Sequence, residues 1–136
     1  MSESNASPIG HELVEQVVNK RVRDARKAEV LLIYEDLLQA VWDRILPTLG
    51  RVTTIAIMER AVVLTKEDYP IIEKLEVGAN GVLLERLKES IEESEPDMIR
   101  EALKELVAEF IDILALLTGD ILVKQVIEEI EERRPS

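Results

Sequence analysis

Residues 96–118, PDMIREALKELVAEFIDILALLT, carry apolar side chains at steps of three and four residues over about six helical turns. At 100° per residue, five of these side chains lie within about 40° of the line through Leu117. They are Ile99, Leu103, Leu106, Phe110 and Ile113, and the stripe is widened by Met98, Ala102, Val107, Ile111 and Leu114. A stripe of this width predicts a buried helix at the centre of a bundle. Asp112 lies about 220° from its centre and is predicted to face solvent.

The rest of the chain is predicted to be mainly helical. Ser7-Pro8 fits a helix start, because proline is favoured in the first turn of a helix. One long N-terminal helix, or two end to end, is expected over about residues 10–46, where no strong breaker occurs before Pro47. Further helices are expected over about 51–65, 82–91 and 120–133. The predicted fold is an all-α bundle of four to six helices with the helix at about 96–118 at its centre.

Residues 73–84 leave two alternatives. A short helix after Tyr69-Pro70 is favoured, because the residues from Val82 onward continue with helical spacing. The alternative is a small hairpin, in which Leu75-Glu-Val and Val82-Leu-Leu pair across Gly78-Ala-Asn-Gly81.

Length and composition indicate one domain over residues 10–134 that follows a flexible N-terminus over residues 1–9. The chain has 136 residues, of which 46% are apolar but only 3% aromatic, so Leu, Ile and Val must form the core. High charge with six amides and no cysteine is typical of a thermophilic protein. No secretory signal or membrane helix is expected, and the cytoplasm is the default location.

The sequence offers no residues for catalysis, for a metal or for a cofactor. His11 is the sole histidine and has no second ligand at helical spacing, and the absence of cysteine removes thiol chemistry and zinc sites built on cysteine. No glycine-rich phosphate loop and no serine–histidine–aspartate set can be assembled. These observations favour a protein that is not an enzyme.

A candidate anion site lies at the turn before the predicted helix 51–65. Glycine permits an unusual backbone angle, and the following helix offers free N–H groups that attract anions. The candidate residues are Thr48, Gly50, Arg51, Thr53 and Thr54. The same residues also fit a purely structural interpretation, in which Thr48 caps the helix and Gly50 forms the turn.

A candidate interface joins the two ends of the chain. If the helices ran straight, their terminal apolar strips would point away from the core and would need cover. The ends also carry opposite charge, with a basic stretch near the N-terminus and an acidic C-terminus. The candidate residues are Val14, Val18, Lys20, Arg21, Arg23, Arg26, Lys27, Val123, Val126, Glu128, Glu129, Ile130, Glu131 and Glu132. We therefore expect the N-terminal arm to pack on C-terminal helices, mainly those of a neighbouring subunit.

Three functions follow as hypotheses. The leading one is a regulatory interaction or oligomerisation module that forms a homodimer or a higher symmetric oligomer, or that binds another helical protein. The second is a sensor for an anion or an apolar metabolite. The third is a nucleic-acid-associated factor that uses the basic stretch at residues 20–27, although a net charge of −11 opposes binding to phosphate backbones.

Overall fold

The computed structural model describes residues 9–22, 27–89 and 96–133, with the side chains of 18–22, 27–30, 96 and 133 left aside. Its elements are α1 (Ile9–Val22), α2 (Lys27–Leu49), α3 (Arg51–Lys66), the 3-10 helix η1 (Pro70–Lys74), β2 (Glu76–Gly78), β3 (Gly81–Leu83), α4 (Glu85–Glu89), α5 (Pro96–Thr118) and α6 (Asp120–Arg133). The predicted all-α bundle is confirmed. None of the helices in these ranges is both long and apolar enough to cross a bilayer.

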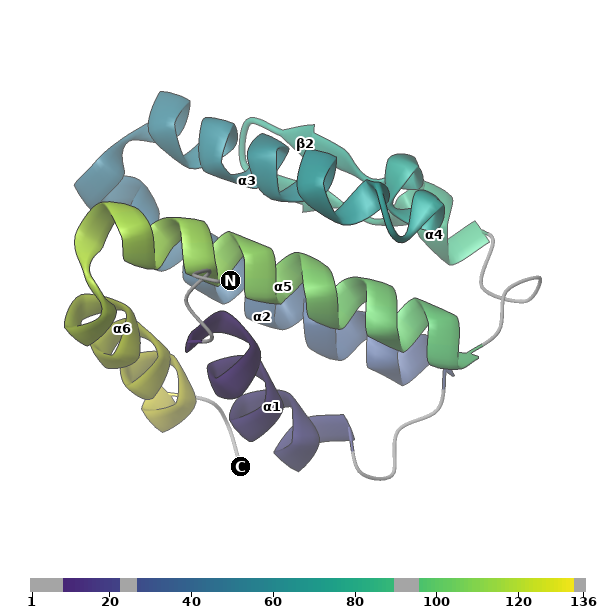
Figure 1. The fold of residues 1–136 in the computed structure, drawn as a ribbon, viewed down its shortest axis with the longest axis horizontal. Coiled ribbons are helices and arrows are strands. Elements are labelled where there is room, and N and C mark those ends of the chain that lie inside the picture. The colour runs from purple at the N-terminus through teal and green to yellow at the C-terminus, as the bar shows by residue number, and fades with distance from the viewer. Residues whose placement is uncertain (1–8, 23–26, 90–95, 134–136) are drawn as a thin grey trace, which may run out of the picture.

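The helix α5 lies at the centre of the fold. It spans the predicted range and contacts α1, α2, α3 and α6. Figure 1 shows α5 beside α2, with α3 and the hairpin on one side and α1 and α6 on the other. Leu103, Leu106 and Phe110 of the predicted stripe are completely buried. The prediction fails at the ends of the stripe, because Met98 is 47% and Leu117 61% exposed where α5 leaves the core.

The expected N-terminal helix consists of two described helices, α1 and α2. The expected helix ends at about residue 46, but α2 continues three residues further, through Pro47 to Leu49. The helix α1 packs mainly on α5 and buries Val14 and Val17 there. Close approach of α1 to α5 requires Gly10, because a Cβ at this position would lie 2.3 Å from the carbonyl oxygen of Ala108.

Residues 76–83 form the hairpin, so a helix over these residues is wrong, whereas the short helix expected after Tyr69-Pro70 is present as the 3-10 helix η1. Val77 pairs with Val82 in antiparallel register, and the short α4 is all that remains of the helix expected over 82–91 within the described residues. Two side chains from the bundle hold the turn. Gln39 Nε2 donates to the carbonyl oxygen of Asn80 over 3.0 Å, and Arg51 Nε donates to that of Ala79 over 3.0 Å. These tertiary contacts stabilise the hairpin, although the spacing of apolar residues after the turn favours a helix.

Candidate functional site

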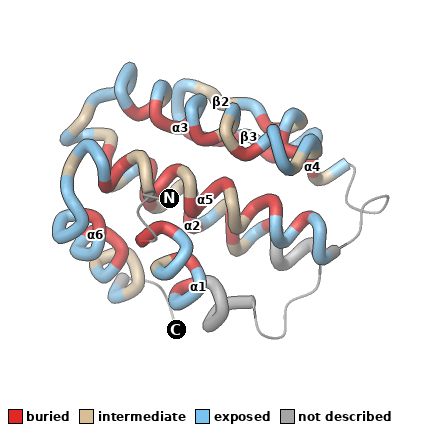
Figure 2. Tube along the Cα trace, viewed as in Figure 1, coloured by how far each residue is buried: buried red, intermediate tan, exposed pale blue. Residues whose placement is uncertain are grey.

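The corner at which α5 turns into α6 carries a cluster of exposed apolar side chains. Gly119 makes this turn with a φ of 96°, and its N–H donates to the carbonyl oxygen of Ala115 over 2.8 Å, which ends α5. Figure 2 shows the turn as an exposed segment of the trace. The exposed side chains on both sides of it are Leu116 at 80%, Leu117 at 61%, Ile121 at 77% and Leu122 at 40%. We call these four residues the apolar corner.

A cavity of about 100 Å³ adjoins the apolar corner between α2, α5 and α6. Two of its three polar lining residues have hydrogen-bond partners inside the chain, and the third, Thr48, is exposed. Thr118 Oγ1 donates to the carbonyl oxygen of Leu114 over 2.8 Å, and Arg44 Nε donates to Glu129 Oε1 over 2.8 Å. The lining residues are Arg44, Ile45, Thr48, Leu49, Leu114, Thr118, Leu122, Val123 and Val126. The walls of the cavity are therefore apolar in character.

The size of the cavity restricts what it can hold. Pockets that enclose small molecules usually measure about 300–1,000 Å³. A cavity of about 100 Å³ is smaller than this range and suits one apolar side chain of a partner. Leu122 belongs both to the cavity wall and to the apolar corner, so the two features form one continuous surface.

In the predicted anion site, the side chains of Arg51 and Thr54 have other partners. Gly50 adopts a φ of 87° as expected, but Thr48 lies inside α2 and does not cap α3, which begins without a side-chain cap. The Arg51 guanidinium contacts the hairpin turn, and Thr54 is buried with its hydroxyl donating to the carbonyl oxygen of Gly50 over 2.8 Å. Thr53 is exposed. Anion binding at this turn stays a prediction for calorimetry.

The two ends of the chain meet within a single copy. The helix α1 contacts α6, and Val14, Val123 and Val126 are buried without help from a neighbouring subunit. Gly119 turns α6 back along the bundle, which explains how the terminal strip reaches the core. Ile130 is half-buried, Glu129 pairs with Arg44, Glu131 has a partner, and Glu128 and Glu132 are exposed. The side chains of Val18, Lys20, Arg21, Arg23, Arg26 and Lys27 lie outside the described part of the chain.

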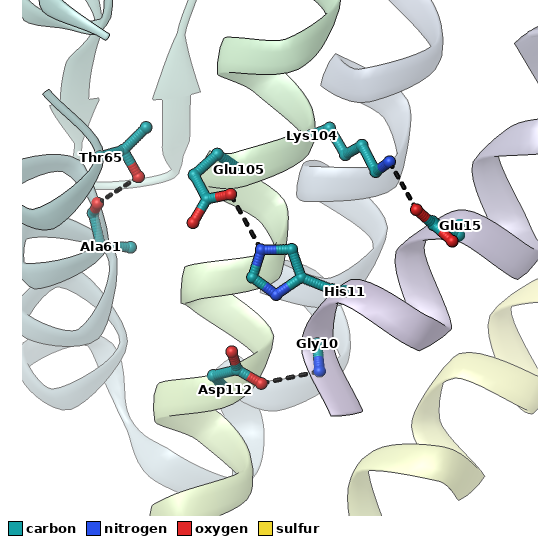
Figure 3. Close-up of polar contacts among 8 residues, drawn as sticks. All are labelled: Gly10, His11, Glu15, Ala61, Thr65, Lys104, Glu105 and Asp112. Atoms are coloured by element: carbon teal, nitrogen blue, oxygen red, sulfur yellow. Dashed lines mark hydrogen bonds and ion pairs between the residues drawn. The ribbon is translucent and has the colours of Figure 1, made fainter. Parts of the chain in front are cut away.

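Polar contacts fix α1 on α5 (Figure 3). Lys104 Nζ donates to Glu15 Oε1 over 2.7 Å, and His11 Nε2 lies 2.9 Å from Glu105 Oε1. Asp112 Oδ1 accepts the backbone N–H of Gly10 over 2.7 Å. Asp112 is thus half-buried against α1, and the expectation that it faces solvent is wrong. A helical wheel of α5 alone contains no information about α1, which covers the side of α5 that carries Asp112.

Burial raises the pKa of two carboxyls in this contact. It raises the pKa of Glu109, with a further contribution from the negative charge of Glu105. Burial also raises the pKa of Asp112, although the hydrogen bond from Gly10 opposes this effect. Lys104 lowers the pKa of Glu15 at the exposed edge of the same contact, through a hydrogen bond and its positive charge.

We expect Asp112→Asn to weaken the pH dependence of stability. A carboxyl whose folded pKa is raised contributes stability that is complete below its unfolded pKa and is lost as the pH rises through the folded pKa. The asparagine oxygen can still accept from Gly10 but carries no charge. The free energy of unfolding, measured with urea at pH 7 and at a pH just below 3.8, the ordinary pKa of an aspartate, should therefore show a smaller loss toward pH 7 in the variant than in the wild type. Equal losses in the two proteins would contradict the prediction, because the opposing contribution of Glu15 is common to both.

No group of three or more histidine or carboxylate side chains in the described residues can hold a metal ion. Comparisons with protein-family models, with curated proteins and with solved structures found no match for this chain. The apolar corner does not follow from helical periodicity, because Leu117 lies by angle on the predicted buried stripe. Two neighbouring leucines directly before Thr118-Gly119 were the available hint.

Proposed function

We propose that the protein is a non-enzymatic helical interaction module that binds a partner chain through the apolar corner. The single observation that carries this proposal is the exposure of Leu116, Leu117, Ile121 and Leu122 beside an apolar cavity. Isolated exposed leucines are ordinary, but four large apolar side chains exposed within seven residues around one turn are typical of an interaction site. A regulatory role, a cytoplasmic location and a thermophilic source stay predictions from composition.

The alternative function of a small-ligand sensor has weaker support. The cavity is smaller than the usual pocket for a metabolite, and two of its three polar lining residues, Arg44 and Thr118, are hydrogen-bonded within the chain. The polar groups that remain at the cavity and at the Arg51 turn are the exposed hydroxyls of Thr48 and Thr53, which carry no charge to bind an anion. A role with nucleic acid depends on the basic stretch at residues 20–27, and the chain as a whole carries a net charge of −11.

The test places a photo-crosslinking amino acid at position 117 in the cells that naturally make the protein. Illumination should give a discrete product whose mass identifies either a second copy or another protein. The matched control carries the same amino acid at Glu67, which is exposed and follows α3 at the opposite end of the bundle (Figure 1). A yield at position 117 no higher than that at position 67 would overturn the proposed function.

A further inference from the structure

The apolar corner has a shape and a charge pattern that suit one particular occupant. We propose that it pairs two copies of this chain about a two-fold axis, with the first turns of the two α6 helices antiparallel. This inference rests on the proposed function and names its partner. In a two-fold interface the same patch lies on both subunits, so each apolar corner covers the other and the assembly closes as a dimer.

The exposed apolar area is large enough for this pairing. Side chains of this size, exposed by 40% to 80%, present on the order of 400 Å² of apolar surface in each copy. Two copies together would remove about 800 Å² of apolar surface from water, and stable specific interfaces bury roughly 1,200–2,000 Å² in total with a polar rim. The corner thus supplies the apolar centre of a small dimer interface, and the first turns of α6 supply its rim.

The charges beside the corner are self-complementary. Asp120 and Lys124 are both exposed, lie one helical turn apart and flank the same side of Ile121. The described structure gives neither of them an ion-pair partner within the chain. In an antiparallel pair centred near Leu122, Asp120 of each copy lies opposite Lys124 of the other. Two equivalent ion pairs result, and they set the register of the interface.

The position of the acidic residues along α6 also favours the antiparallel arrangement. Each chain carries a net charge of −11, and four glutamates occupy residues 128–132 near the end of α6. A parallel pair of α6 helices would place these acidic segments side by side, where like charges repel. The antiparallel pair directs them to opposite ends of the interface.

The experiment uses two charge reversals, Asp120→Lys and Lys124→Asp, in the full chain. Each variant alone places like charges opposite each other twice, so its dimer dissociation constant should rise by about fivefold to thirtyfold at low salt. An equimolar mixture of the two variants restores both ion pairs in the heterodimer, which should form with nearly the wild-type affinity. Sedimentation velocity over a concentration series measures the dissociation constants of the wild type, of each variant and of the heterodimer, and a charge-neutral tag on one variant identifies the heterodimer.

Matched controls make the same charge changes far from the corner. Glu67→Lys and Lys66→Asp, at the end of α3, should leave the dissociation constant unchanged. Leu117→Ser should abolish dimerisation while the helical circular dichroism and the melting temperature of the monomer stay the same. A mixture of the two α6 variants no tighter than either variant alone, or a wild-type monomer at all concentrations, would overturn the dimer.

The result also separates this inference from the proposed function. A monomeric protein that crosslinks at position 117 to a different protein would overturn the two-fold dimer and would leave the interaction module standing. A monomeric protein without a specific crosslink at position 117 would overturn both.

Discussion

Leu106→Ala is expected to lower the free energy of unfolding by about 2–5 kcal/mol, because it leaves a cavity in a close-packed core. Leu106 is completely buried at the centre of α5, next to Phe110, which is buried to the same extent. Neighbouring side chains collapse only partly into such a space, so both transfer free energy and packing contacts are lost. Urea unfolding followed by circular dichroism measures the change.

The matched control is Leu116→Ala on the same helix. Leu116 is 80% exposed, so this substitution should change the free energy of unfolding by no more than about 0.5 kcal/mol at concentrations where the chain is monomeric. Similar losses for the two leucines would show that α5 is not the centre of the core.

Gly10→Ala is expected to destabilise the fold by about 1–3 kcal/mol, although alanine is the better helix former. The new Cβ would lie 2.3 Å from the carbonyl oxygen of Ala108 and 2.6 Å from Asp112 Oδ1. The first contact is with backbone, which cannot rotate away, so α1 must shift outward and lengthen the hydrogen bond from Gly10 to Asp112. Thermal unfolding and faster amide exchange in α1 report this change.

Gly78→Ala provides the control for the same chemical change. A Cβ at Gly78 would meet its nearest neighbour at 3.5 Å, which is an ordinary contact. This variant should therefore keep the wild-type melting temperature within a few degrees. An increase in stability for Gly10→Ala would mean that helix propensity outweighs the close contact between α1 and α5.

The central helix could be predicted because its information is local. Period and length alone define residues 96–118, and the interruption at Gly119 marks the end of α5. The hairpin could not be chosen with the same certainty. Gly78-Ala-Asn-Gly81 fits a turn, but the contacts from Gln39 and Arg51 that hold it come from residues 28 or more positions away.

The burial of Asp112 and the exposure of the apolar corner could not be predicted from the sequence for the same physical reason. Asp112 looks solvent-exposed on its own helix, yet the N-terminus of α1 covers it. Leu117 lies on the buried stripe by angle, but α5 extends past its neighbours at that point. Helical periodicity gives the direction of a side chain and does not give the distance over which the neighbouring helices continue beside it.

Trp42 gives this protein an internal optical probe of folding. It is the sole tryptophan of the chain, is completely buried on α2, and its indole Nε1–H has no hydrogen-bond partner among the described residues. An indole in such dry surroundings should emit at short wavelength and shift to longer wavelength when water enters. Trp42 lines neither the apolar corner nor its cavity. Its emission should therefore follow unfolding and stay constant on association, so one fluorescence channel can separate loss of the fold from loss of the partner.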